Sequence, residues 1–188
     1  MVSASALRAP RSLVSAPAVI TIPGIAADGS LYPIEKLEAH RLGVLHLAIS
    51  AFVFFGDQLL IQRRATSKYH CAGLWANTCC THPHWGESVE ASATRRLREE
   101  LGISVPLTET RIVEYRAAVG SGLTEHERVH MFVGRVETAA IPMRLDPEEV
   151  DTVRWVTPQG LRAEIARGPE QFTPWFRIYV ERFPDLTF

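Results

Sequence analysis

One helix in this sequence has clear start and stop signals, and an amphipathic helix must bury its apolar side against another layer of structure. Ser88 is a suitable N-cap, and Gly102 is a residue type that commonly ends a helix. Between them, Ala93, Leu97 and Leu101 recur at helical spacing and form one apolar stripe. The pattern predicts a helix from Ser88 to about Leu101.

Segments with β-strand character lie on both sides of this helix. The expected strands are residues 45–55, 58–63, 111–119, 127–136 and 152–156. Gly56-Asp57 joins the first two into a hairpin, and a bend at residues 120–122 joins the third to the fourth. Two later helices are expected to begin at Thr157-Pro158 and Thr173-Pro174. The fold class is therefore α/β, and we expect a sandwich of helices on a sheet.

Composition bounds the size of the fold and its partners. With 188 residues, 46% hydrophobic residues and a formal net charge of −1, the chain suits one globular domain with a sizeable core. The near-neutral charge argues against a nucleic-acid binder but is compatible with a local basic pocket for a small anion. The sequence has no run of about 18 apolar residues, so we expect no membrane span. We expect a flexible tail over residues 1–20 and one domain over residues 21–188, as a monomer or weak homodimer.

The cysteines indicate a reducing environment. Cys71, Cys79 and Cys80 are odd in number, and two of them are adjacent. A framework of disulfides in a secreted protein is improbable for such a set. We therefore expect a cytoplasmic protein.

Two short segments carry residues suited to metal binding and proton transfer. Residues i and i+2 of an extended segment share a face, so Cys80 and His82 point the same way, as do Glu125 and Glu127. Cys79 faces the opposite way by the same argument. The two segments predict one metal and one proton-transferring thiol, that of Cys80, at a common site.

The expected helix also carries a known sequence pattern. Residues 87–103 resemble a Nudix box, whose general form is G-x5-E-x7-R-E-U-x-E-E-x-G-U with U apolar. Thr81 stands in place of the first Gly, and Arg96 stands in place of the first Glu of the R-E pair. Replacing a metal-binding carboxylate by a cation reduces the capacity of the site to bind several metal ions. The site therefore favours binding a diphosphate over hydrolysing it. Arg96 and Glu100 lie four apart on one helical face and can meet a phosphate together, directly and through Mg²⁺.

Further motifs make the resemblance more specific. From about residue 32 to residue 179, the chain resembles the type 1 isopentenyl-diphosphate Δ-isomerases, which have a Nudix-type α/β/α sandwich with a mixed central sheet. The matching segments are residues 35–40, 45–48, 63–68, 73–83, 115–117, 125–127 and 172–175. The resemblance implies the interconversion of isopentenyl and dimethylallyl diphosphate, with a small diphosphate as the partner.

The resemblance also implies a metal site. Its ligands would be His40, His46, His82, Glu125 and Glu127. That family holds Mg²⁺, Mn²⁺ or Zn²⁺ there, and a mixture of imidazole and carboxylate ligands suits a transition metal or Zn²⁺ better than Mg²⁺ alone.

The remaining roles follow from the same resemblance. The reaction passes through a carbocation-like state, so it needs two opposed proton carriers in a dry pocket. These would be Cys80 and Glu127, assisted by Tyr115, while Trp175 offers a π face to the cation. The diphosphate would be bound by Lys36, Arg64, Lys68 and Arg96, with Glu100 holding the Mg²⁺ linked to the substrate.

Two other functions are compatible with the sequence. One is a Nudix hydrolase of a nucleotide or another diphosphate, which Arg96 disfavours. The other is a silent diphosphate-binding or thiol-redox protein, which the pairing of Cys80 with Glu127 disfavours. The remaining histidines are expected on the surface or in ordinary packing; they are His70, His84, His126 and His130.

Overall fold

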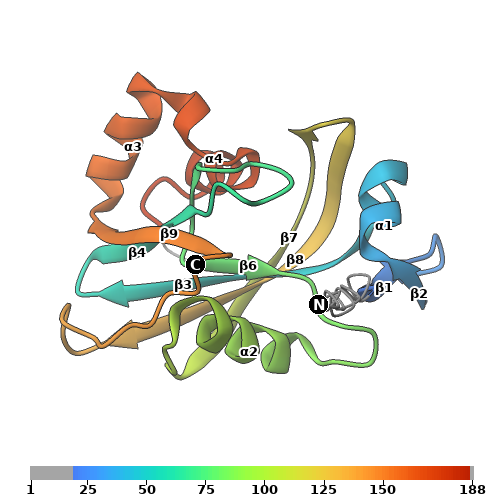
Figure 1. Ribbon diagram of the computed structural model, residues 1–188, viewed down its shortest axis with the longest axis horizontal. Helices are drawn as coiled ribbons and strands as arrows, with labels where there is room; N and C mark the ends of the chain where they lie inside the picture. Colours follow the sequence, from blue (N-terminus) through green and yellow to red (C-terminus); the bar gives the residue numbers. More distant parts are fainter. Residues whose placement is uncertain (1–18, 187–188) are drawn as a thin grey trace, which may run out of the picture.

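The computed structural model describes residues 19–186, and within them one nine-stranded sheet carries four α-helices and one short 3₁₀ helix (Figure 1). The strands are β1 (Thr21–Ile25), β2 (Leu31–Glu35), β3 (His46–Phe55), β4 (Gln58–Arg64), β5 (Trp75–Ala76), β6 (Cys79–Thr81), β7 (Leu107–Gly120), β8 (Leu123–Val136) and β9 (Val150–Val156). The helices are α1 (Lys36–Leu42), α2 (Val89–Leu101), α3 (Pro158–Arg167), the 3₁₀ helix η1 (Pro169–Gln171) and α4 (Pro174–Arg182).

Strand β3 is the centre of the sheet. It runs parallel to β8 and antiparallel to β1, β4 and β6, while β7 pairs with β8, and β5 and β9 pair with β4. The register of β3 and β8 begins with His46 opposite Glu127 and ends with Phe55 opposite Val136. The sheet is therefore mixed, and its central pair places an imidazole beside a carboxylate.

The helices form layers on the two faces of the sheet. Figure 1 shows α2 on one face and α3 with α4 on the other. The stripe of Ala93, Leu97 and Leu101 on α2 is at most 1% exposed, because it packs on the sheet. This is the α/β sandwich predicted from the sequence.

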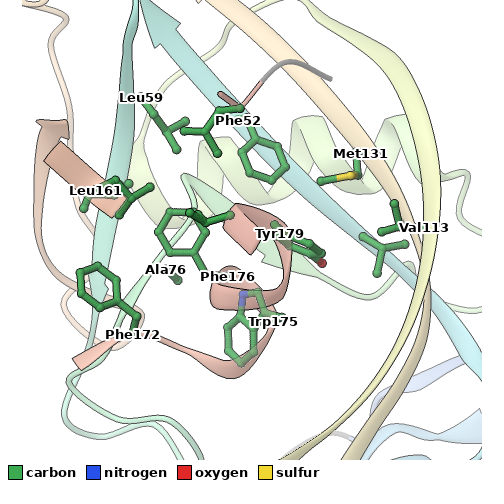
Figure 2. Packing of buried hydrophobic residues seen from close by; sticks show 14 of the residues in the cluster. Phe52, Leu59, Ala76, Val113, Met131, Leu161, Phe172, Trp175, Phe176 and Tyr179 are labelled. Carbon is green, nitrogen blue, oxygen red and sulfur yellow. The ribbon is translucent and has the colours of Figure 1, made fainter. Parts of the chain in front are cut away.

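The larger hydrophobic core lies under α4. Figure 2 shows Trp175, Phe176 and Tyr179 of α4 beside Phe52 of β3 and Met131 of β8. Burial of such aromatic side chains is a major source of folding free energy. The same packing fixes α4 over the middle of the sheet, where the candidate site lies.

The limits of the predicted elements agree closely with the structure where capping residues define them. Helix α2 begins after Ser88, whose Oγ accepts a hydrogen bond from the amide of Ala91 at 3.2 Å. It ends at Gly102, whose φ of 68° lies in the left-handed region that glycine tolerates best. Helices α3 and α4 begin at the expected Thr-Pro pairs. Strands β7 and β8 are both longer than expected, at 14 residues each.

The sequence prediction missed the first three elements. Strands β1 and β2 form an antiparallel hairpin, and α1 follows directly. The carboxylate of Glu35 caps α1 by accepting hydrogen bonds from the amides of Leu37 and Glu38, and Gly43 ends the helix. Residues 1–18 of the predicted tail lie outside the described residues. Between residues 19 and 186, no helix has the length and apolar character to span a membrane.

Candidate active site

A cavity between the sheet and α4 contains most of the residues named from the sequence. It is lined by Lys36, Arg64, Lys68, Cys80, His82, Arg96, Glu100, Tyr115, Glu125, Glu127 and Trp175. His40 and His46 lie behind its wall and are fully buried. The structure thus gathers residues from five strands and three helices into one region.

Three histidines and one glutamate form the inner end of the site. Ligand atoms of His40, His46, His82 and Glu127 all lie within 4.8 Å of one another. Nε2 of His82 is 2.9 Å from Oε1 of Glu127 and 3.2 Å from Nε2 of His46. The main-chain register of β3 and β8 and the end of β6 set this arrangement.

The tautomers of two of these histidines follow from their partners. Nδ1 of His40 lies 2.6 Å from the carbonyl oxygen of Lys36, and Nδ1 of His46 lies 2.8 Å from that of Val44. A carbonyl oxygen only accepts, so each Nδ1 carries the hydrogen and each Nε2 presents a lone pair. Nε2 of His40 is buried and has no partner.

This group fits a metal ion. Burial lowers the pKa of His40 and holds that of His82 well below its usual value, despite the nearby Glu127. Neutral imidazole is the form of histidine that binds metals. Converging neutral nitrogens, a carboxylate oxygen and an unpartnered buried Nε2 therefore suit a divalent cation.

Glu125 and Glu127 share one hydroxyl group. Oη of Tyr115 lies 2.8 Å from a carboxylate oxygen of each. Burial, and then the charge of Glu127, raise the pKa of Glu125 well above its usual value. Burial also acts to raise the pKa of Glu127, but the neighbouring imidazoles of His46 and His82 outweigh it and hold that pKa well below the usual value. One hydroxyl hydrogen serves one acceptor, so a protonated Glu125 beside an ionised Glu127 satisfies all three groups when no cation is present.

The two adjacent cysteines lie on opposite sides of β6. Cys80 lines the cavity. Cys79 is fully buried and packs with Leu97 and Leu101 beneath α2. Alternation along the strand predicted this separation. Burial raises the pKa of Cys80 well above its usual value, so its sulfur carries a proton at neutral pH.

The other end of the cavity is basic. Arg96 Nη2 lies 2.5 Å from Oε1 of Glu100 and 3.1 Å from Oε2 of Glu149, and Lys68 Nζ lies 2.6 Å from the same oxygen of Glu149. Burial and neighbouring cations lower the pKa of Lys36 to about 8. Lys36, Lys68 and Arg96 also line a hollow at the protein surface, so the basic end is the open end.

Trp175 serves both the core and the cavity. It is only 2% exposed, and its Nε1 donates a hydrogen bond to Oδ1 of Asn77 at 3.2 Å. The guanidinium of Arg64 lies over its ring, 5.4 Å from the centroid. The indole is therefore held in one orientation against the cavity.

Sequence reasoning misplaced His70 and missed Glu149. His70 was expected on the surface or in ordinary packing, but it is 9% exposed and lines the cavity between His40 and Trp175. It lies in the loop after β4, where no periodic pattern shows which way a side chain points. Glu149 lies just before β9, and its sequence neighbours gave no functional signal. His84, His126 and His130 lie outside the cavity lining, as expected.

Comparison with known proteins identifies the family. Residues 44–176 match the NUDIX domain family. A Cereibacter sphaeroides protein named isopentenyl-diphosphate Delta-isomerase (strain ATCC 17029) is 54% identical over 86% of this chain and 91% of its own length. A Rhodobacter capsulatus protein of the same name is 52% identical over 86% of this chain and 92% of its own length. This chain belongs to the isopentenyl-diphosphate Delta-isomerase family. Its membership confirms the resemblance seen in the sequence.

Solved structures confirm the fold class. A Deinococcus radiodurans protein superposes with a TM-score of 0.69 at 18% identity, covering 86% of this chain and 98% of that protein. A MutT NUDIX hydrolase from Burkholderia pseudomallei superposes with a TM-score of 0.57 at 21% identity, covering 74% of this chain and 98% of the hydrolase. At these identities the likeness establishes the Nudix fold of this isopentenyl-diphosphate Delta-isomerase family member, and the chemistry rests on its own residues.

Proposed function

We propose that this protein interconverts isopentenyl diphosphate and dimethylallyl diphosphate by protonating one carbon of the substrate and deprotonating another. The observation that carries this proposal is a thiol and a carboxylate, Cys80 and Glu127, lining one cavity with a basic opening. The two relatives named isopentenyl-diphosphate Delta-isomerase support it.

Cys80 and Glu127 are the proposed proton carriers. A proton added to the terminal carbon of the double bond leaves a tertiary cation, and loss of a proton from the neighbouring chain carbon forms the new double bond. A protonated thiol and an ionised carboxylate are complementary states for these two steps. Tyr115, whose hydroxyl contacts Glu127, can pass or stabilise a proton at that carboxylate.

The rest of the cavity protects the cation. Trp175 and Tyr179 are at most 2% exposed and line the cavity together with Tyr115. Aromatic faces stabilise positive charge, and the exclusion of water prevents capture of the cation. We propose that Trp175 provides the π face nearest to the reacting carbons.

The open end binds the diphosphate in this proposal. Its cations are Lys36, Arg64, Lys68 and Arg96. Their side chains can pair with phosphate oxygens that would otherwise be costly to bring into the cavity. Glu100, held by Gln62 Nε2 at 3.0 Å and by Arg96, would hold Mg²⁺ that accompanies the diphosphate.

A second ion belongs at the inner end of the site. His40, His46, His82 and Glu127 would hold it. The family resemblance adds Glu125 as a further ligand, and this mixed set would favour Zn²⁺ or Mn²⁺ over Mg²⁺ alone. When bound, the ion supplies positive charge that keeps both carboxylates ionised and fixes their orientation.

Hydrolysis of a diphosphate is disfavoured by the pairing of Arg96. This arginine contacts both Glu99 and Glu100 on α2, the carboxylates that a Nudix box would offer to metals. A cation within the carboxylate set opposes the binding of several divalent ions.

The test is a direct product analysis. The protein is incubated with isopentenyl diphosphate, Mg²⁺ and Zn²⁺ or Mn²⁺, and the reaction is followed by ¹H NMR alongside a phosphate assay. We expect dimethylallyl diphosphate without phosphate release. Release of phosphate would establish a hydrolase, and an unchanged substrate that nevertheless binds would establish a silent diphosphate-binding protein.

Location and assembly are also proposals. The described cysteines are all free, which supports a cytoplasmic location. We propose a monomer or a weak homodimer, because the site is built from one chain; light scattering over a range of concentrations measures this directly.

A further inference from the structure

His70 occupies a place in the cavity that the proposed roles leave unused. Its ring stacks on that of His40, with centroids 6.1 Å apart and an interplanar angle of 25°. Nδ1 of His70 is buried and has no hydrogen-bond partner, and the same is true of Nε2 of His40. Two buried nitrogens without a partner are costly unless a ligand satisfies them.

A carboxylate lies next to these nitrogens. Ligand atoms of His40, His70 and Glu125 lie within 4.8 Å of one another and form a group distinct from the group that contains His46, His82 and Glu127. Two imidazoles and one carboxylate are a donor set that binds Zn²⁺ in proteins and leaves a position open.

The position of His70 is well defined by its neighbours. Arg64 Nη2 donates to the main-chain carbonyl of His70 at 3.4 Å. The rings of Tyr69 and Trp175 both contact the ring of His70 edge-on, with centroids 4.4 Å and 6.2 Å away. A ligand held by its surroundings in this way binds a metal with a smaller loss of entropy.

We propose that His40, His70 and Glu125 form a second ion position beside the group of His40, His46, His82 and Glu127. This inference rests on the proposed metal site and adds His70 to it as a ligand. The two positions share Glu125 and His40, and Nδ1 of His40 carries a hydrogen bonded to the carbonyl of Lys36. Its Nε2 has a single lone pair and cannot bind two ions at once. One ion therefore occupies one position or the other, and His70 retains it when the first group is weakened.

The test measures Co²⁺ and Zn²⁺ binding without substrate, so it is independent of isomerase activity. The visible absorption of Co²⁺ reports imidazole ligands, and competition with a chromophoric chelator gives the Zn²⁺ affinity. The protein carrying His82→Gln, in which the first group is broken, should still bind one ion. Adding His70→Gln should weaken that binding by at least about tenfold, since even outer residues of metal sites contribute 10–100-fold.

A matched control is available on the face of β8 opposite to Glu125 and Glu127. His130 contacts Glu109 there, away from the cavity. Combining His82→Gln with His130→Ala should leave the Zn²⁺ affinity of the single variant unchanged. Equal affinities with and without His70 in the His82→Gln background would overturn the proposal.

Two further measurements keep the test decisive. If the melting of the metal-free protein shows that His82→Gln is unfolded, His70→Gln alone is compared with His130→Ala in the otherwise natural chain. A changed Co²⁺ spectrum and weaker binding only for His70→Gln support the proposal, and identical spectra and affinities contradict it.

The stoichiometry of the natural chain should be one ion; two tightly bound ions would refute the sharing of His40. If the predicted binding holds but no isomerisation occurs, the proposed function fails while this inference stands.

Discussion

His46 and Glu127 face each other across the parallel strands β3 and β8, and Nε2 of His46 lies 3.6 Å from Oε1 of Glu127. Both residues are buried, and the hydrogen-bonded pairing of β3 with β8 fixes the separation of their main chains. A site on rigid strands holds its geometry better than one on loops. The proposed ion and the proposed proton acceptor are therefore positioned by the fold before any ligand arrives.

Cys80→Ala should reduce kcat by about 100-fold or more, because it removes one of the two proposed proton carriers. Cys79→Ala should retain most of the turnover, since Cys79 packs beneath α2 on the other side of β6. Steady-state rates of both variants, with circular dichroism as a check on folding, measure the difference. Similar losses in the two variants would argue that neither sulfur transfers a proton.

Arg64→Ala should raise KM for the diphosphate substrate, because Arg64 lines the cavity and can pair with phosphate oxygens there. The residue is only 8% exposed. Arg63→Ala is the matched control, since Arg63 is exposed and pairs with Asp151. Initial rates over a range of substrate concentrations separate KM from kcat. An unchanged KM in Arg64→Ala would remove this residue from the diphosphate site.

The value of kcat/KM should fall above about pH 8, where Lys36 loses its proton in the free enzyme. Burial and the charges of Lys68, Arg96 and Arg64 lower the pKa of this lysine, and a neutral amine no longer attracts the diphosphate. Lys36→Gln should have a lower kcat/KM at neutral pH and should lack the decline. A decline of the same size in Lys36→Gln would assign it to another group.

Glu149→Gln should destabilise the protein at neutral pH, because Glu149 pairs with Lys68 and Arg96. Burial acts to raise the pKa of Glu149, but the hydrogen bond from Lys68 and the charges of Arg96 and Lys68 outweigh it, so the folded-state pKa lies below the ordinary 4.5. A lowered carboxyl pKa stabilises the fold fully above the unfolded-state value and loses that effect as pH falls through the folded-state value.

The difference in unfolding free energy between the natural chain and Glu149→Gln should therefore be constant above pH 4.5 and shrink at lower pH. Urea denaturation at several pH values measures it. Glu148→Gln, at an exposed neighbouring position, is the control and should show little effect. A pH-independent difference for Glu149→Gln would contradict the lowered pKa.

Local patterns in the sequence predicted the middle of the molecule well. Alternation along an extended chain separates Cys80 from Cys79 because it depends only on main-chain geometry. The caps Ser88 and Gly102 define α2 because they satisfy the free ends of a helix locally. Such signals act within a few residues, so they survive in a single sequence.

Other features depend on contacts that no local pattern reveals. Strands β1 and β2 pair Pro23 with Pro33, and proline is normally read as a sign against a strand. Helix α1 is seven residues long and is capped by Glu35, which is not a usual capping residue. His70 lines the cavity from the loop after β4, and its neighbours His40 and Trp175 are distant in sequence.

The hydrogen bond between Nδ1 of His40 and the carbonyl oxygen of Lys36 spans one turn of α1. At a rise of about 1.5 Å per residue, this short helix separates Lys36, proposed to bind the diphosphate, from His40, proposed to bind a metal, by about 6 Å along its axis. Sliding α1 would carry both groups together and preserve that spacing. Inserting a single residue between them would rotate one group by about 100° around the helix axis relative to the other. The relative placement of the two groups therefore depends on the present length of α1.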